Sequence, residues 1–176
     1  MKENQRSRLS KILLKNALIS LLQEKSIQKI SIKEICDTAE LNRTTFYKYY
    51  CNEYELLQDL CNDALQMLLE SIGKNKPFSI KKMLEIISSE KNIIKAIFNN
   101  NADENLPKRI LAIPEIKEYI IADIDKNKSP VEVDIIVNFV CYGAYYIIKD
   151  WITNDCSISV SCLAEQIVYL SQKLCK

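Results

Sequence analysis

Histidine is absent from this 176-residue chain, and glycine and proline are scarce. Without histidine, Ser-His-Asp triads, Cys-His nucleophile pairs and Cys-His zinc sites are all excluded. Gly73 and Gly143 are the only glycines, and there are four prolines. Apolar residues recur every three or four positions without the alternation of strands, which predicts an all-α protein. The sequence shows no constellation for catalysis and no phosphate-cradling glycine loop, so we expect no enzyme, no metal and no cofactor.

Targeting signals are also missing from the sequence. The N-terminal "MKENQRSRLSKILLKNALISLL" resembles a signal peptide in charge, but Lys15 and Ser20 interrupt its apolar part and no small-residue cleavage site follows. The seven cysteines are an odd number without a CxxC pair, so we expect reduced, mostly buried thiols. The longest apolar stretch, "VDIIVNFVCYGAYYIIKDWI", contains Asp134 and Asn138 and predicts a buried helix, not a membrane span. These features indicate a cytoplasmic protein with no membrane partner.

The charge of the chain is divided unevenly. Residues 1–50 hold ten Lys/Arg against five Asp/Glu, a balance of +5, whereas residues 51–176 have a balance of −4. A polyanionic partner is therefore expected at the N-terminal end.

The first fifty residues predict three helices, at about 8–25, 32–39 and 43–49. Ser31 begins "SIKE", a capping box with Glu34 at the third helical position, and Asn42 is a good N-cap for the third helix. Two short helices joined by a tight turn, with a longer helix in front, are typical of a helix-turn-helix module. The second short helix is the element that would enter the major groove of DNA.

The rest of the chain predicts further helices. A long helix covers about 53–72 and ends at Gly73, and one bent helix or two shorter ones follow between 79 and 99. Residues 106–124 are helical with a break at Pro114, and the last two helices cover 130–153 and about 158–174. We place a DNA-binding domain at residues 1–52 and a second helical domain at 53–176.

The third predicted helix, in "NRTTFYKYY", combines aromatics, hydroxyls and basic residues. Phe46 and Tyr50 are predicted core residues that face the two preceding helices. The remaining side chains are then exposed, where hydroxyls and phenols can donate to phosphates, Lys and Arg can neutralise them, and Arg and Thr can read base edges. The alternative is an ordinary solvated helix whose aromatics pack on the following helix. The capping box, helix spacing and charge together favour DNA binding.

The stretch "ALISLLQEKSIQKISIKEICDTAELNRTTFYKYYCNEYELL" resembles the DNA-binding domain of TetR-family transcriptional regulators, and the match covers residues 9–60. "NRTTFY" is similar in particular to the branch that includes regulators of dihydroxyacetone kinase operons. The resemblance implies a helix-turn-helix domain followed by a helical ligand-binding and dimerisation domain. It implies that bases and nearby phosphates are contacted by Arg43, Thr44 and Thr45, that the phosphate backbone is gripped by Tyr47, Lys48 and Tyr49, and that Ser31 offers a phosphate its hydroxyl or amide. Asn42, which begins the third helix, completes the expected DNA-binding set.

Three positions depart from the family pattern. Glu40 stands where a turn glycine is common, Tyr49 replaces the usual histidine, and Glu53 replaces a lysine at the start of the fourth helix. Because these changes remove positive charge or add an acid near DNA, they bear on affinity and operator choice more than on the mode of binding.

The resemblance also implies a homodimer through the last two helices and an unknown small-molecule effector. Two recognition helices about 34 Å apart then predict a pseudo-palindromic operator. The candidate pocket residues are seven of the aromatic and methionine residues of the second domain: Met67, Met83, Phe98, Tyr119, Phe139, Tyr142 and Tyr146.

The leading hypothesis is a dimeric DNA-binding regulator, a repressor released by its effector. Glu40 and Glu53 motivate an alternative, an interaction module of the same fold that regulates a protein partner and binds DNA weakly. Cys36 and Cys51, in or beside the DNA module, motivate a thiol-responsive regulator as a third hypothesis.

Overall fold

The computed structural model describes residues 5–72, 78–100 and 105–175, which form ten α-helices and one 3-10 turn without any strand among them. The all-helical expectation is confirmed. The chain divides into two compact units, Met1–Leu65 with Asn92–Asp103, and Gln66–Lys91 with Glu104–Lys176. We call them unit 1 and unit 2 and describe each by itself; the predicted domain boundary after residue 52 stays a prediction.

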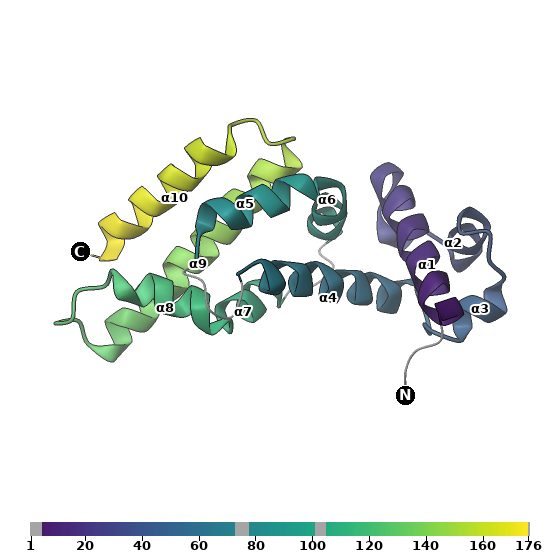
Figure 1. Cartoon of the computed structure of the whole chain (residues 1–176), viewed down its shortest axis with the longest axis horizontal. Helices are drawn as coiled ribbons and strands as arrows, with labels where there is room; N and C mark the ends of the chain where they lie inside the picture. Colours follow the sequence, from purple (N-terminus) through teal and green to yellow (C-terminus); the bar gives the residue numbers. More distant parts are fainter. Residues whose placement is uncertain (1–4, 73–77, 101–104, 176) are drawn as a thin grey trace. The chain divides into compact units, whose positions relative to one another are not determined.

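Unit 1 holds the N-terminal helices (Figure 1). Its elements are α1 (Gln5–Glu24), the 3-10 turn η1 (Ile27–Lys29), α2 (Ile32–Thr38), α3 (Arg43–Tyr47), the first part of α4 (Glu53–Ile72) and most of α6 (Lys91–Asn99). Helix α1 packs against α2, and α2 packs against α3. Their core contains Leu14, Ala17, Leu18, Ile35, Cys36, Phe46, Leu56 and Leu57.

The segment that follows α1 is hydrogen-bonded to the end of α6. The Asn100 side chain accepts a hydrogen bond from the Ile27 backbone N–H at 2.8 Å, and its amide donates to the Ala96 carbonyl at 2.8 Å. The end of α6 is thereby tied to η1, the turn that delivers the chain into α2.

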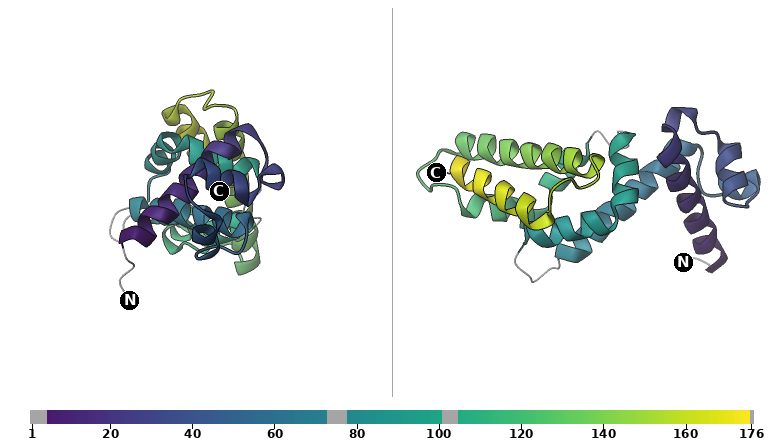
Figure 2. Two further views of the ribbon diagram at one scale, coloured as in Figure 1. Left: turned by 90° about the vertical axis from the view of Figure 1, so that its right-hand side faces the viewer. Right: turned by 90° about the horizontal axis from the view of Figure 1, so that it is seen from above.

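Unit 2 holds the remaining helices. They are α5 (Ile80–Ser89), α7 (Leu106–Leu111), α8 (Pro114–Ala122), α9 (Pro130–Thr153) and α10 (Val160–Cys175). Helix α10 packs against α5 and α9, and α7 and α8 pack against α9. The right-hand view of Figure 2 shows α10 (yellow) beside α9 (green). The core includes Leu84, Ile87, Val137, Ile148, Trp151, Ile152, Leu163 and Ile167.

Local sequence signals set most of the helix ends. Pro114 and Pro130 each stand at the first position of a helix, where the missing N–H has no intrahelical acceptor. Ser129 and Glu132 form a second capping box at the start of α9. The helices predicted at 53–72 and 130–153 are confirmed with those bounds, and the segment 79–99 is two helices, α5 and α6. Gly73, the predicted end of α4, lies outside the described residues.

Candidate nucleic-acid interface

Helix α3 is anchored by its apolar side. Phe46 is fully buried and Tyr50 is 4% exposed, and their ring centroids lie 5.8 Å apart. At the other end, the Asn42 side chain accepts the backbone N–H of Thr45 at 2.7 Å, which caps the helix as expected. A five-residue helix has little stability of its own, so these contacts with its surroundings fix its position.

The opposite side of α3 faces outward. Arg43, Thr44 and Lys48 are exposed, and the Tyr47 side chain is 58% exposed. Thr45 is half-buried, and its hydroxyl donates to Asn42 Oδ1 at 2.8 Å, so it is engaged locally. The outward side of α3 therefore offers a guanidinium, an ammonium, a hydroxyl and a phenol whose ring rests edge-on against that of Phe46, with centroids 5.7 Å apart. These groups donate hydrogen bonds to phosphates and base edges.

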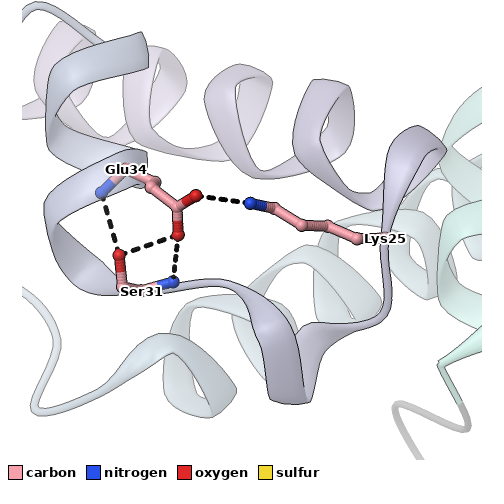
Figure 3. Close-up of polar contacts among 3 residues, drawn as sticks. All are labelled: Lys25, Ser31 and Glu34. Atoms are coloured by element: carbon pink, nitrogen blue, oxygen red, sulfur yellow. Dashed lines mark hydrogen bonds and ion pairs between the residues drawn. The ribbon is translucent and has the colours of Figure 1, made fainter.

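The capping box at α2 is fully formed (Figure 3). Glu34 Oε2 accepts the Ser31 backbone N–H at 2.9 Å and the Ser31 hydroxyl at 2.8 Å, while Glu34 Oε1 pairs with the Lys25 ammonium. The Lys25 hydrogen bond, followed by those from Ser31, lowers the pKa of Glu34 to about 2. Both donors of Ser31 are engaged with Glu34 in this structure, and the phosphate contact implied for Ser31 stays a prediction.

A polar network fixes the end of the recognition segment to α4. The Tyr50 hydroxyl donates to Asp59 Oδ2 at 2.7 Å, and the Lys15 ammonium lies 2.8 Å from Asp59 and 2.6 Å from Asp63. Burial opposes ionisation of Asp59, but the hydrogen bonds from Lys15 and Tyr50 outweigh it, so the pKa of Asp59 is lowered. This network could not be predicted from the sequence, because no short-range pattern relates Lys15 to residues more than forty positions away.

Tyr49 joins the end of α3 to α1. Two ammonium groups lie over its ring, with Lys11 Nζ 5.8 Å and Lys48 Nζ 5.4 Å from the ring centroid. The Ser7 hydroxyl first, then the charge of Lys48 and the Ser10 hydroxyl, lower the pKa of its phenol. Ser7, Ser10 and Lys11 were not predicted as site residues, although their i, i+3, i+4 spacing puts them on one face of α1.

The turn between α2 and α3 carries an acid in an unusual conformation. Glu40 has a φ of 54°, in the left-handed region that favours glycine. The Leu41 N–H donates to the Cys36 carbonyl at 2.9 Å and the Glu40 N–H to the Asp37 carbonyl at 3.3 Å. These two bonds are those of a Schellman motif with Glu40 at the position that glycine usually fills. The turn is thus a Schellman motif although no glycine stands in it.

The second acidic departure has a structural role at the start of α4. Glu53 and Glu55 lie in the first helical turn, where negative charge is favourable beside the positive end of the helix dipole. Glu55 also accepts the Cys51 backbone N–H at 2.6 Å. Helix stability therefore accounts for an acid where the family pattern has a lysine.

The two cysteines of the DNA module are not activated. Burial raises the pKa of the Cys36 thiol, and the side-chain hydrogen bond with Glu55 raises that of Cys51. Because the thiolate is the reactive form, both shifts weigh against the thiol-responsive hypothesis.

The predicted pocket residues are divided between the two compact units. Phe98 is buried in unit 1, on α6, whereas the other six belong to unit 2. Four of these six, Met67, Met83, Tyr119 and Tyr142, are half-buried, and the Tyr119 ring lies 5.0 Å from that of Phe78. Phe139 and Tyr146 are 65% and 56% exposed. A shared effector pocket of these seven residues stays a prediction.

Helix α9 is buried on one side only, so the expectation of a buried helix needs correction. Val131, Ile135 and Phe139 recur at every fourth position and are between 63% and 69% exposed. On α10, Tyr169, Leu170 and Leu174 are exposed as well. By length and composition alone α9 meets the criteria for a membrane span, a match that core helices of soluble proteins also give and that is weak evidence for one helix. Exposed apolar residues grouped in this way, as on α9 and α10, are typical of a surface that contacts another molecule.

Comparison with known proteins identifies the second half of the chain. A TetR-type family model described as the transcriptional regulator C-terminal region matches residues 75–173. The HTH-type transcriptional regulator YxbF of Bacillus subtilis (strain 168) is 24% identical over 172 residues, which cover 91% of this chain and 44% of that protein. An HTH-type transcriptional regulator of Haemophilus influenzae is 22% identical over 126 residues, covering 66% and 62% respectively. The chain thus spans less than two thirds of either curated relative.

Two solved structures share the fold over nearly the whole chain. A TetR transcriptional regulator from Streptococcus agalactiae 2603V has a TM-score of 0.73 at 23% identity and covers 95% of this chain and 96% of its own. The dihydroxyacetone kinase operon activator DhaS has a TM-score of 0.61 at 22% identity, with coverage of 94% and 96%. At these identities the likeness concerns the fold.

Proposed function

The chain belongs to the TetR family of transcriptional regulators, and we propose that it is a homodimeric repressor that binds a pseudo-palindromic DNA operator through α3. The family is one of regulators and not of enzymes. The observation that carries the proposal is the two-sidedness of α3. Phe46 and Tyr50 anchor it from inside, while Arg43, Tyr47 and Lys48 face outward with the chemistry that binds a phosphate backbone.

The outward residues divide by what they can contact. Arg43 and Thr44, at the start of α3, are the candidates for base edges, where a bidentate arginine favours guanine. Tyr47, Lys48 and Tyr49, at its end, are the candidates for phosphates. Thr45 and Asn42 are bonded to each other, so we assign them to the geometry of the helix start more than to base contacts. Residues 1–52 would then be the DNA-binding domain, and 53–176 the regulatory and dimerisation domain.

The exposed apolar residues of α9 and α10 support dimerisation. A stripe with Val131, Ile135 and Phe139 more than 60% exposed is unfavourable in water and suits a two-fold contact with the same stripe of a second copy. Two copies would place two α3 helices on one duplex, about one helical turn (~34 Å) apart. The operator would then be pseudo-palindromic, and the protein would act in the cytoplasm.

An unknown small molecule bound in the regulatory domain would release the repressor. DhaS is named as an activator of a dihydroxyacetone kinase operon. Since the likeness to DhaS is one of fold, neither that effector nor that direction of regulation passes to this chain by itself. A promoter–reporter fusion with and without the gene distinguishes repression from activation.

The test of DNA binding is fluorescence anisotropy on duplex tiles that span the region upstream of the protein's own gene. We expect tight binding to one palindromic tile and a loss of at least tenfold in affinity for Tyr47→Ala, which removes an exposed phenol. Because the Tyr47 ring also contacts that of Phe46, circular dichroism checks that the variant is folded. Ile121→Glu in unit 2, a substitution away from α3, is the control and should bind as the wild type does.

Weak binding of equal strength to every tile, erased by salt, would contradict operator recognition in that region. The same titration against genome-wide fragments would then decide between a distant operator and the alternative of a fold that regulates a protein partner.

A further inference from the structure

The contact between Tyr49 and α1 extends the DNA-binding surface beyond the helix-turn-helix. We propose that Ser7 and Lys11 of α1 form, with Lys48 and Tyr49, an additional site for a DNA backbone phosphate. This inference rests on the proposed function, since it needs a duplex seated on α3. The site draws its donors from two helices that are far apart in sequence and meet at one aromatic ring.

The Tyr49 ring brings two ammonium groups together. Lys11 Nζ, from α1, and Lys48 Nζ, from the end of α3, lie 5.8 and 5.4 Å from the Tyr49 centroid. Cation–π attraction holds both ammonium groups near the phenol and so concentrates two positive charges there.

Two serines of α1 act on the same phenol. Ser7, first, and also Ser10 contribute to the lowered pKa of Tyr49, while the Ser10 hydroxyl donates its proton to the Arg6 carbonyl at 3.0 Å. Hydroxyl, phenol and ammonium groups are the donors that proteins use toward phosphate oxygens, and Ser7, Tyr49 and the two lysines supply them here. Ser7, Lys11 and Tyr49 are half-buried, and Lys48 is exposed.

The position of Ser7 and Lys11 near the start of α1 also favours an anion. The cluster lies in the first two turns of a 20-residue helix, the positive end of its dipole, and the first turn carries no acidic residue. Arg6 and Arg8 are exposed in the same turns. An anion is therefore favoured there by the helix, by two arginines and by the two lysines at Tyr49.

The test measures the salt dependence of binding for Lys11→Gln on the operator and on a scrambled duplex of equal length. Each phosphate contact contributes about 0.9 to the slope of log affinity against log salt. We expect the slope to fall by about that amount on both duplexes, because phosphate contacts carry no sequence information. When salt is raised fourfold, the variant should lose about 3.5-fold less affinity than the wild type.

Three controls define the interpretation. Lys11→Arg keeps the charge and should keep the slope, and Lys126→Gln removes an exposed lysine of unit 2 and should leave binding unchanged. Tyr49→Phe keeps the ring but removes the phenol hydroxyl, so it should lower affinity for both duplexes at an unchanged slope.

A folded Lys11→Gln protein with the wild-type slope would overturn the proposal. If Lys11→Gln does not fold by circular dichroism, Tyr49→Phe decides, and an unchanged affinity for both duplexes overturns it. A wild type that binds the scrambled duplex as tightly as any tile would contradict operator recognition, while the slopes on that duplex would still test this site. A wild type that binds no duplex would overturn both.

Discussion

The exposed faces of α3 and α9 have opposite chemistry. On α3 the outward side chains are those of Arg43, Thr44, Tyr47 and Lys48, whereas on α9 the most exposed stripe is apolar and contains Val131 and Phe139. Both helices bury their other side in the core of their own unit. The difference teaches that the chemistry of an exposed face limits what can bind there. The face of α3 suits the polyanion proposed as its partner, and the face of α9 suits the apolar surface of the proposed second copy.

The two helices also differ in what keeps them helical. Helix α9 has 24 residues, a proline at its first position and a capping box, so local interactions contribute much of its stability. Helix α3 has five residues and depends on Phe46 and Tyr50. A core substitution should therefore affect the two units unequally.

The largest effect is expected for Phe46→Ala. Deleting a fully buried phenylalanine should lower the free energy of unfolding of unit 1 by roughly 3–5 kcal/mol. Trp151, the single tryptophan, is buried in unit 2, so urea unfolding followed by its fluorescence should shift less than unfolding followed by far-UV circular dichroism. Tyr47→Ala, at the exposed neighbour, should cost only about 0.5–1.5 kcal/mol, because it removes one edge contact with the Phe46 ring and little buried area. Coincident transitions in Phe46→Ala would show that the units unfold as one.

Next in size is the effect of Phe139→Glu on association. A charge at the centre of an apolar two-fold contact should weaken dimerisation by about 2 kcal/mol or more, which is roughly 30-fold. Sedimentation velocity over a concentration series measures this. Ile121→Glu, at an apolar side chain on α8 that is 38% exposed, is the matched control. If Phe139→Glu dimerises as the wild type does, the stripe on α9 is not the interface.

A smaller effect is expected at the turn that positions α3. Glu40→Gly should raise the free energy of unfolding by about 1 kcal/mol, because glycine adopts the left-handed conformation without the steric cost of a Cβ. Glu40→Asn should recover part of this gain and Glu40→Ala none of it. All three remove the acid, so they should raise DNA affinity to a similar extent in anisotropy titrations. A gain in affinity that follows the gain in stability would instead assign Glu40 a purely conformational effect.

The smallest effect concerns the pH dependence of the stability that the two capping boxes contribute, one in each unit. The folded pKa of Glu34 is about 2, below its ordinary value of 4.5, so its carboxylate stabilises the fold fully above pH 4.5 and this contribution is lost as the pH falls toward 2. The difference in melting temperature between wild type and Glu34→Gln should shrink across that window.

Glu132 has a lowered pKa from its bonds with Ser129, and Glu132→Gln should show the same direction of change. A pH-independent difference for Glu34→Gln would show that the box stabilises α2 by hydrogen bonding alone.

Much of the helix-turn-helix could be predicted because its signals are local. Ser31 with Glu34 and Asn42 with Thr45 act within three residues of each other, so sequence spacing suffices to place the starts of α2 and α3. The burial of Phe46 and Tyr50 followed from the 3.6-residue period. The contact of Tyr49 with Lys11 could not be predicted in this way, since it depends on how α1 and α3 are placed by their packing against α2.

The sequence by itself determined which segments are helical and where most of them start, because caps, prolines and periodicity act over a few residues. It also determined which family the chain resembles. Only the tertiary structure decided that Lys15 joins Asp59 and Tyr50, that Lys11 reaches Tyr49, and that one stripe of α9 remains exposed. The physical reason is that the contact between two side chains distant in sequence is fixed by the packing of whole helices, and no short-range pattern encodes that packing.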